Sequence, residues 1–234
     1  MSLGLFVTDR GTQLKVTGDV PDSGTDVDLE NDLGFDTSDS VLRIDGNFRF
    51  NEAHRIDFSA FDLSRSASKQ IQRDIEWDGE VYPIGTVVSA GLDLTIHKLA
   101  YTWSFMRRER GFVGASIGAY VADIGTSIAA NTLSQSSSHG VTAPLPVVGL
   151  RGQYAIADKW SLRGSAEFFG FDYGDFCGNL YDMYAGIDYQ LFENVAVGLG
   201  YNSVRFDIGV AKTNFDGDMD WRYDGGLLFL KFDF

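Results

Sequence analysis

The sequence predicts an all-β fold: an up-and-down antiparallel β-barrel of about ten strands, with eight or twelve strands as the alternatives. Three observations predict this fold. Apolar and polar residues alternate along most of the 234-residue chain, no 3.6-residue periodicity runs far enough for a convincing helix, and short connections alternate with long ones. Because the alternation runs along the whole chain, it indicates a single barrel domain over residues 1–234. An even number of strands brings both chain ends to one rim.

The composition allows a folded domain and excludes a membrane-spanning helix. Hydrophobic residues make up 44% and charged residues 22% of the chain, both ordinary for a globular protein. No stretch approaches the ~18 uncharged apolar residues that a spanning helix needs, although a closed barrel also satisfies its backbone in lipid. The net charge of −14 leaves no basic stripe to neutralise phosphates, so nucleic acid is excluded as a partner.

The predicted strands are assigned from the alternation of side chains across a strand. In the second strand, Leu42 and Ile44 face one side, whereas Arg43 and Asp45 face the other. The ten strands are predicted over residues 3–18, 40–50, 55–70, 86–107, 111–126, 144–156, 160–174, 179–192, 195–211 and 219–234.

The fourth predicted strand changes phase near its middle. Leu94 and Ile96 occupy one set of alternate positions, and Leu99 and Tyr101 occupy the other set. One extra residue in a strand moves the following side chains to the opposite face. The sequence therefore predicts a β-bulge at His97 and Lys98.

The later strands repeat the pattern with clear faces. The fifth, “FVGASIGAYV”, sets apolar residues against Gly and Ser, and the seventh, “WSLRGSAEF”, sets Arg163 and Glu167 against Leu162. The eighth, “YDMYAGIDYQL”, and the ninth, “VAVGLGYN”, alternate in the same way. The tenth ends as “LLFLKFDF”, where Lys231 and Asp233 lie between apolar residues. Each strand therefore has one apolar face and one face that is polar or made of small residues.

The connections between these strands are of two kinds. Four are short (“NEAHR”, “RRERG”, “ADK” and “EN”), and they alternate with longer polar segments. The long segments are residues 19–39, 71–85 and 127–143, with two shorter ones around Cys177 and “NFDGDM”. Short turns at one rim and long loops at the other are typical of membrane barrels.

With these features the chain resembles the bacterial outer-membrane β-barrel proteins over nearly its whole length. The segments “VDLENDLGFD”, “FRFNEAHRIDFSAFDLSRS” and “PLPVVGLRGQYAIADKWSLR” are similar to those of small uncharacterised outer-membrane proteins of Gram-negative bacteria. The ending is similar to the C-terminal signal that the barrel-assembly machinery recognises, which here would comprise Leu228, Leu230, Phe232 and Phe234.

The resemblance implies a location and partners but no reaction. It implies an integral protein of the cell outer membrane with short periplasmic turns and longer extracellular loops. The implied partners are outer-membrane lipid, lipopolysaccharide and the barrel-assembly machinery, and we expect a monomer. The first four residues, “MSLG”, have neither the basic nor the apolar region of a signal peptide. Either the protein is cytosolic or the chain begins after a leader, and the resemblance favours the second.

In such a barrel the apolar face of each strand contacts lipid and the charged face lines the lumen. A soluble lipocalin-like cup would place its apolar faces inward instead. Aromatic residues near strand ends favour the membrane barrel, because girdles of Trp and Tyr lie at the bilayer interfaces. The expected girdle residues are Tyr101, Trp103, Tyr154, Trp160, Tyr189 and Trp221.

The inward charged face predicts a network of ion pairs. Acids and bases are nearly balanced there, which favours pairs that fill a narrow barrel, and a narrow channel is the alternative. The predicted lumen charges are Arg43, Asp45, Arg49, Asp57, Arg151, Arg163, Glu167, Asp182, Asp188 and Lys231, together with Asp93.

The sequence contains no convincing catalytic constellation, so we do not expect an enzyme. Of the three histidines, His54 lies in a short turn, His97 at the suspected bulge and His139 in the Ser-rich segment “SQSSSHG”. No Gly-x-Ser-x-Gly motif or Cys/His metal spacing is present. Cys177 has no flanking histidine and is expected to be inert.

The first long loop is acidic and contains neither Lys nor Arg. Carboxylate clusters suit Ca²⁺ or Mg²⁺, but the loop lacks EF-hand spacing. A repulsive, solvated loop is one reading. A loosely bound divalent cation that bridges to lipopolysaccharide phosphates is the other, and no other cofactor is expected. The candidate ligands are Asp26, Asp28, Glu30 and Asp32.

These observations favour a non-enzymatic outer-membrane barrel, either structural or a narrow porin-like channel for small solutes. The first alternative is a binding or adhesion protein that acts through its surface loops and uses the barrel as an anchor. The second is a lipid-modifying enzyme, which the missing Ser/His pairing disfavours.

Overall fold

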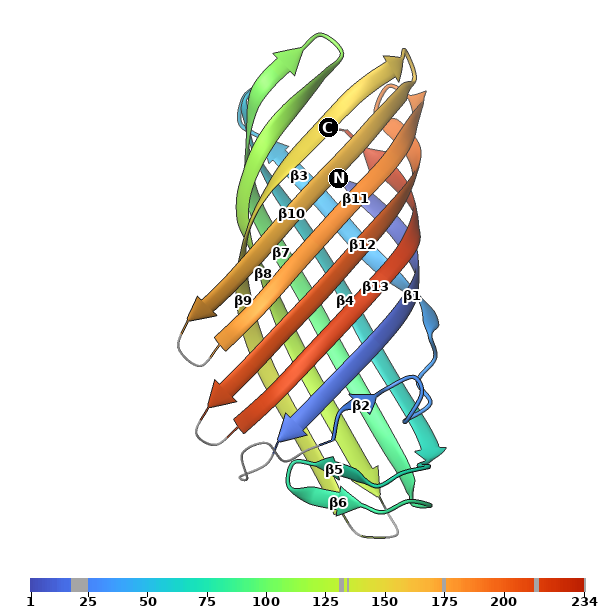
Figure 1. Cartoon of the computed structure of the whole chain (residues 1–234). Helices are drawn as coiled ribbons and strands as arrows, with labels where there is room; N and C mark the ends of the chain where they lie inside the picture. The colour runs from blue at the N-terminus through green and yellow to red at the C-terminus, as the bar shows by residue number, and fades with distance from the viewer. Residues whose placement is uncertain (18–24, 131–132, 134, 174–175, 213–214, 234) are drawn as a thin grey trace.

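The structure is a computed structural model that describes residues 1–17, 25–130, 133, 135–173, 176–212 and 215–233. Over these residues, ten long strands form a closed antiparallel barrel in which consecutive strands are neighbours (Figure 1). The barrel strands are β1 (Ser2–Thr17), β3 (Ser38–Arg49), β4 (His54–Gln70), β7 (Val87–Arg108), β8 (Gly111–Ala130), β9 (Gln135–Ala157), β10 (Trp160–Tyr173), β11 (Phe176–Phe192), β12 (Val195–Lys212) and β13 (Phe215–Phe232).

The first and last strands close the barrel. β1 pairs with β13 along its whole length, from Ser2 opposite Lys231 to Thr17 opposite Asp216. Both chain ends therefore lie at the rim that carries the short turns, the upper rim in Figure 1. Within the described residues, no helix is long and apolar enough to cross a membrane. The all-β, ten-stranded barrel predicted from the alternation is confirmed.

Several strands are much longer than a membrane crossing requires. β7 contains 22 residues and β9 contains 23, whereas about 9–11 tilted residues cross the hydrocarbon. The expected loop over residues 127–143 is wrong, because β8 and β9 stay paired up to Ala130 opposite Gln135. Ser is frequent in this stretch, so it lacks the apolar alternation of a strand, although residues 127–130 pair with residues 135–138.

An apolar belt surrounds the barrel near the short-turn rim. Its side chains point away from the barrel and are largely exposed, as Leu99 is at 59%. Tyr101, Trp103, Tyr154 and Trp160 are also exposed, toward the short-turn ends of their strands, where an interfacial girdle is expected. The belt includes Leu3, Leu5, Leu42, Phe58, Leu99, Ile117, Leu150, Leu199, Leu228 and Leu230.

Farther along the same strands the two faces exchange their character. Asp93 points outward, away from the lumen where it was predicted, and accepts a hydrogen bond from Ser64 on the neighbouring strand. Trp221, predicted as a girdle residue, is instead inside the barrel and only 2% exposed. The barrel therefore extends beyond its lipid belt into water, where polar side chains cover the outside and apolar ones fill the inside.

The exchange of faces explains the phase change in β7 without a bulge. His97 pairs with Ala60 and Lys98 with Ser59 in continuous register, and the register toward β8 is also unbroken there. The predicted bulge is therefore wrong, and the irregularity in this pairing lies between Trp103 and Met106. Leu94 and Ile96 point inward and Leu99 points outward because they lie at different levels of the barrel.

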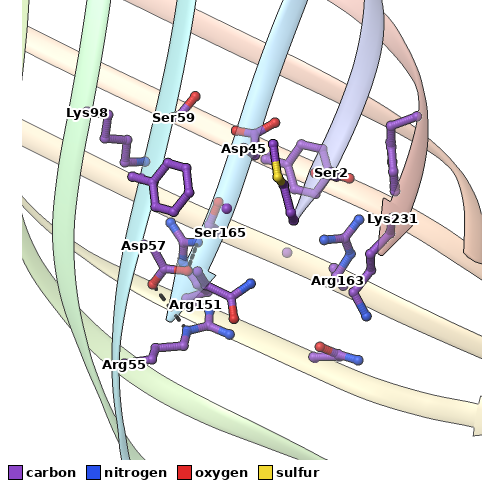
Figure 2. Close-up of a pocket in the computed structure, with 18 of the residues that line it drawn as sticks. Ser2, Asp45, Arg55, Asp57, Ser59, Lys98, Arg151, Arg163, Ser165 and Lys231 are labelled. Carbon is purple, nitrogen blue, oxygen red and sulfur yellow. Dashed lines mark hydrogen bonds and ion pairs between the residues drawn. The ribbon is translucent and has the colours of Figure 1, made fainter. Parts of the chain in front are cut away.

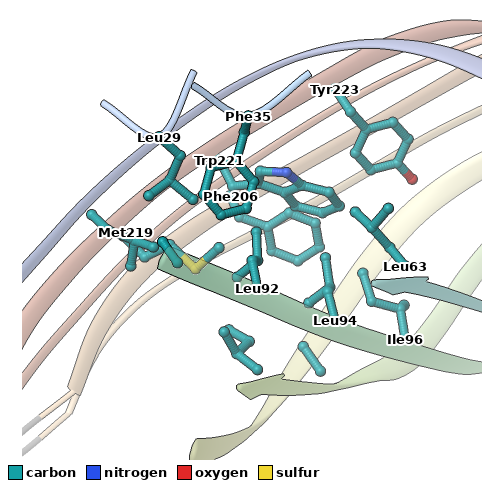
Figure 3. Packing of buried hydrophobic residues seen from close by; sticks show 14 of the residues in the cluster. Leu29, Phe35, Leu63, Leu92, Leu94, Ile96, Phe206, Met219, Trp221 and Tyr223 are labelled. Atoms are coloured by element: carbon teal, nitrogen blue, oxygen red, sulfur yellow. The ribbon is translucent and has the colours of Figure 1, made fainter. Parts of the chain in front are cut away.

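The interior of the projecting part is a packed apolar core (Figure 3). Trp221 lies between Phe206 and Tyr223, with ring centroids 5.3 Å and 4.7 Å away. Leu92, Leu94 and Ile96 of β7 pack in the same cluster. The interior is thus divided into this apolar layer and a polar layer nearer the short-turn rim.

Two loop segments close the projecting end. The segment after β1 contains β2 (Val27–Asp28), and a hairpin is formed by β5 (Ile75–Trp77) and β6 (Glu80–Tyr82). The side chains of Val27, Ile75 and Tyr82 are fully buried. The backbone N–H of Thr25 donates to the carbonyl of Glu76 at 2.9 Å, which joins the two segments. The chain's own loops therefore cover the apolar core.

Candidate functional site

The polar layer is built around Lys98. Glu167 on β10 and Asp182 on β11 stand directly opposite each other and both are buried. Two carboxylates in that arrangement repel each other. Lys98 forms an ion pair with Glu167 and lies 3.8 Å from Asp182, and the Tyr120 hydroxyl lies within hydrogen-bond distance of both carboxylates. Lys98 and Tyr120 together offset the repulsion between the two carboxylates.

Arg151 carries the network across the barrel. Its guanidinium lies 3.0 Å from Asp57 and 3.1 Å from Glu167. Asp57 also accepts hydrogen bonds from Arg55 Nε at 3.1 Å and from Thr102 Oγ1 at 2.7 Å. Residues from β4, β7, β9 and β10 are thereby tied together inside the barrel.

Asn202 connects Asp182 to a second arginine. Its amide donates to Asp182 at 2.6 Å, and its carbonyl oxygen accepts from Arg43 Nη1 at 2.6 Å. Arg43 Nε also bonds Asp45 at 3.0 Å. Buried charges are costly unless they are paired and hydrogen-bonded, and this cluster meets that condition through a neutral amide.

The structure places the ten predicted lumen charges in two groups. Eight form ion pairs of the interior: Arg43, Asp45, Asp57, Arg151, Arg163, Glu167, Asp182 and Asp188. Arg49 is exposed near the rim, and Lys231 bonds Asp233 there at 2.8 Å. Arg163 and Asp188 pair with each other at 2.8 Å.

Sequence reasoning missed several members of the network. Lys98 was hidden by the supposed bulge, because an uninterrupted alternation from Leu92 through Lys98 to Thr102 would have placed it inward. Arg55 stands two positions before Asp57 on the same face and could have been found by that spacing. Tyr120 and Asn202 carry no charge, so a search for charged residues did not identify them.

The acidic loop is engaged by arginines of the chain itself. Glu30 lies 2.8 Å from Arg65 and accepts the backbone N–H of Thr12 at 2.8 Å. Asp32 lies 2.5 Å from Arg73. Burial alone would raise the pKa of Asp32, but the hydrogen bonds from Arg73 and the Asp28 backbone, together with the charges of Arg73 and Lys69, outweigh burial and hold the pKa below its ordinary value.

The four candidate metal ligands are therefore dispersed. Asp28 accepts hydrogen bonds from Asn31, and the backbone carbonyl of Asp26 accepts from Arg73. In the described part of the chain, His, Cys, Asp and Glu side chains form no group of three that could hold a metal ion. A divalent cation bound by Glu30 or Asp32 would have to displace an arginine.

His139 lies in a small polar cluster at the projecting end. Its Nε2 is 2.9 Å from Asp78 and 3.1 Å from Ser137 Oγ, and Ser137 also donates to Asp78 at 2.8 Å. In a Ser-His-acid triad the two ring nitrogens contact the serine and the acid separately. Here one nitrogen meets both partners, so the cluster joins the β5–β6 hairpin to β9 and lacks the triad geometry.

The other predicted residues lie away from any such cluster. His54 stacks on Tyr101, with ring centroids 5.8 Å apart, and His97 is exposed on the outside of β7. Leu228 and Leu230 point outward into the belt, and their role in assembly stays a prediction. Phe234 and the side chain of Cys177 lie outside the described residues.

A cavity of about 150 Å³ lies between the polar layer and the short-turn rim. Figure 2 shows Arg55 and Arg151 beside Asp57 on one side of it, with Arg163 and Lys231 across from them. Among the described residues, the basic side chains that line it are Arg43, Arg49, Arg55, Lys98, Arg151, Arg163 and Lys231, and the carboxylates are Asp45, Asp57, Asp182 and Asp233.

The apolar layer contains much less space. A void of about 10 Å³ lies there, lined by Leu94, Ile96, Ala122, Ile124, Phe206, Met219 and Trp221. A cavity needs roughly 10–15 Å³ to hold one water molecule. The cavity of the polar layer therefore meets a tightly packed floor toward the projecting end.

The fold is that of a known class of membrane proteins. The outer-membrane protease OmpT from Escherichia coli matches with a TM-score of 0.60 and 9% identity, over 99% of this chain and 96% of that chain. The chain has the outer-membrane β-barrel fold. The predicted fold is confirmed, and the exposed apolar belt agrees with the predicted outer-membrane location. At 9% identity the likeness to OmpT is one of fold.

Two other barrels match over similar lengths but less closely in shape. The transport unit of the autotransporter AIDA-I from Escherichia coli matches with a TM-score of 0.46 and 11% identity, over 100% of this chain and 91% of that chain. The attachment invasion locus protein Ail of Yersinia pestis matches with a TM-score of 0.37 and 9% identity, over 97% of each chain. No protein-family model and no curated protein sequence matches the chain.

Proposed function

We propose that this protein is a non-enzymatic, structural outer-membrane barrel whose interior does not conduct ions. The observation that carries the proposal is the filling of the barrel by two stacked layers, one of paired charges and one of apolar side chains. Of the two predicted functions, structural barrel and narrow porin, this filling favours the first.

The polar layer opposes conduction because its charges are committed to one another. An ion that crossed it would have to separate partners such as Lys98 and Glu167, or Arg151 and Asp57. Separating a buried pair exposes each charge to a poorly solvated environment, which typically costs about 3–5 kcal/mol. An ion that crossed the whole layer would have to separate several such pairs in succession.

The apolar layer opposes conduction by excluding water. Its void of about 10 Å³ has no polar lining residue, and the β5–β6 hairpin covers it from outside. Empty cavities with apolar walls stay dry. A hydrated ion therefore has no path through this layer unless the hairpin leaves and the aromatic side chains move apart.

Planar-bilayer recordings of the refolded full chain test the proposal. We expect no steady conductance from the wild type. The double variant Phe206→Ala and Trp221→Ala, which empties the apolar layer, should admit at least transient openings. Leu199→Ala, which removes a lipid-facing side chain, should remain closed and serves as the matched control.

A steady conductance in the wild type would overturn the proposal in favour of a narrow porin. The Arg163→Ala variant distinguishes a narrow porin from a closed barrel. A porin would keep its conductance in this variant and change only its ion selectivity. In a closed barrel the same variant leaves Asp188 without its arginine and should either stay closed or open intermittently.

The proposal includes the surroundings expected of such a barrel. Outer-membrane lipid and lipopolysaccharide would contact the apolar belt, the barrel-assembly machinery would act during biogenesis, and the protein would be a monomer. A monomeric mass after detergent correction in light scattering is the expected result, and a stable dimer would contradict it.

A further inference from the structure

We propose that the cavity at the short-turn rim binds a small oxyanion of about the size of phosphate, which enters from the periplasmic side. The proposal concerns the cavity rather than the closed layers beneath it, and it holds whether or not the barrel conducts. Four observations carry it: an excess of basic over acidic side chains in the lining, unused guanidinium donors, a suitable volume and an entrance at the rim.

Basic side chains outnumber carboxylates around the cavity. Among the described residues, seven Arg and Lys side chains and four Asp side chains line it. Each of these carboxylates already has a basic partner: Asp45 bonds Arg43, Asp57 bonds Arg55 and Arg151, Asp182 lies 3.8 Å from Lys98, and Asp233 bonds Lys231. The excess of positive charge favours an anion in this space.

The arginines, in contrast, keep donors that face the cavity. Arg163 uses only Nε toward Asp188, and its charged group otherwise lies over the Phe229 ring at 4.7 Å. Arg55 uses only Nε toward Asp57 and lies over the Phe112 ring at 4.7 Å. In the described part of the chain, the terminal amino groups of these two arginines make no hydrogen bond to protein.

Arg49 adds a cation without a carboxylate partner. It is exposed at the rim, lines the cavity and forms no ion pair with any described residue. Arg151 is also incompletely used, because its buried Nε has no hydrogen-bond partner among the described atoms. An isolated guanidinium gains most from an acceptor with two or more oxygens, since its donors form a planar fork.

The shape of the cavity suits one compact anion. Donors approach from strands on different sides, β3 with Arg43, β4 with Arg55 and β10 with Arg163, and Ser59 and Ser165 also line the space (Figure 2). The volume of about 150 Å³ exceeds the roughly 10–15 Å³ that one water needs. It therefore accepts an oxyanion with part of its hydration shell.

A glycine on β12 leaves room for an aromatic ring that lines the cavity. The Tyr184 ring lies so close to Gly200 that a Cβ there would meet its Cε2 atom at 2.6 Å. A side chain at Gly200 would displace this ring, whose centroid lies 6.0 Å from the charged group of Arg163. The glycine thus lets an aromatic ring form part of the wall behind the arginine.

The entrance lies at the rim of the short turns. Asn47, Arg49, Lys231 and Asp233 line the cavity there, whereas Lys98 and Asp182 form its inner end. The apolar layer lies beyond, so an anion does not reach the cavity from the projecting end. Because short turns face the periplasm in this class of barrel, the ligand comes from the periplasm or from an adjacent lipid headgroup.

Titration of the refolded full chain with inorganic phosphate, in a zwitterionic detergent at constant ionic strength, tests the proposal. We expect one saturable site by isothermal titration calorimetry. Sulfate should compete with phosphate, and chloride at equal ionic strength should not. Absence of saturable phosphate binding, or equal competition by chloride, would overturn the proposal.

Two variants and a matched control locate the site. Arg163→Gln should weaken phosphate binding about tenfold or more, because it removes a charge-assisted donor. Arg49→Gln breaks no ion pair, so it should fold normally and weaken binding about threefold. Arg110→Gln removes a charge from a neighbouring turn that does not line the cavity and should leave binding unchanged. Equal losses in Arg49→Gln and Arg110→Gln would overturn the proposal.

A further arm separates the two sources of the anion. A short-chain phosphatidic acid below its micellar concentration is titrated alongside inorganic phosphate. If phosphate binds and the loss in Arg49→Gln is the same for both ligands, the phosphate group itself is recognised, as proposed. Binding of the lipid without binding of phosphate would overturn the proposal of a free oxyanion.

Discussion

The two ends of strand β7 show how one strand serves two environments. Near the short-turn rim, Leu99 faces lipid and Lys98 belongs to the buried charge network. Nearer the projecting end, Leu94 is inside and only 2% exposed, while Asp93 is outside. The alternation never breaks, but its polarity is reversed. Which face of a barrel strand is apolar therefore depends on whether lipid or water surrounds the barrel at that level.

The two levels are stabilised by different interactions. In water, burial of apolar surface drives folding by about 25 cal/mol per Å², which suits the core around Trp221. Within the lipid belt, lipid is as apolar as a protein core, so moving a leucine inward brings no such gain. There the inside can be polar, and its stability depends on the pairing of charges such as Lys98 and Glu167.

Breaking the polar layer at its centre has the largest expected effect. Lys98→Met would leave Glu167 and Asp182 opposite each other without their cation. We expect a loss of about 3–5 kcal/mol in the free energy of unfolding, measured by urea titration in detergent. Lys159→Met, in an exposed turn, is the matched control and should change stability by less than about 0.5 kcal/mol. Equal effects would show that the network is not stabilising.

A charge placed on the outside tests where the lipid belt ends. Leu99→Arg should cost about 2–4 kcal/mol because the side chain faces the hydrocarbon. Val87→Arg changes an outward residue on the same strand, 52% exposed beyond the belt, and should cost less than about 0.5 kcal/mol. The measurement is the unfolding free energy in lipid vesicles. Similar costs at both positions would mean that lipid covers the whole length of β7.

Release of the hairpin tests how the projecting end is closed. Asp78→Asn weakens the contact between the Asp78 carboxylate and His139 Nε2, which as a partly exposed polar contact should contribute about 0.2–1 kcal/mol. We expect up to about fivefold faster tryptic cleavage at Arg73, beside the hairpin. Asp62→Asn, on the outside of β4, should cleave at the wild-type rate. Unchanged cleavage in Asp78→Asn would show that Ile75 and Trp77 hold the hairpin without this polar contact.

The smallest expected effect is a local dependence on pH. The pKa of Asp32 is lowered in the folded protein by Arg73, so the stabilisation is present above the ordinary pKa of about 4 and is lost as pH falls below it. Hydrogen exchange of residues 27–35 should accelerate from pH 5 to pH 3 relative to the same segment in Arg73→Gln. Parallel exchange in both proteins would exclude this linkage.

Much of the fold could be predicted from residue patterns. The period-2 alternation and the short connections predicted the closed ten-stranded barrel and its lipid-facing leucines correctly. The segment 127–143 was predicted wrongly because backbone pairing alone extends β8 and β9 there. Of the charge network, Arg151 and Glu167 were found, since their charge marks the polar face of a strand. Tyr120 and Asn202 were missed because an uncharged residue carries no such mark.

The sequence by itself determined that each strand has two unlike faces, because side chains alternate whatever the surroundings. Only the tertiary structure decided which face points inward at each level. Trp221 is inside and Asp93 outside because their strands extend past the belt into water, where the apolar face must be buried. Lys98 is inside because it lies at the level of the lipid, where charge is excluded from the outer face. The alternation is a local property, whereas the level of a residue depends on how all ten described barrel strands are paired and staggered.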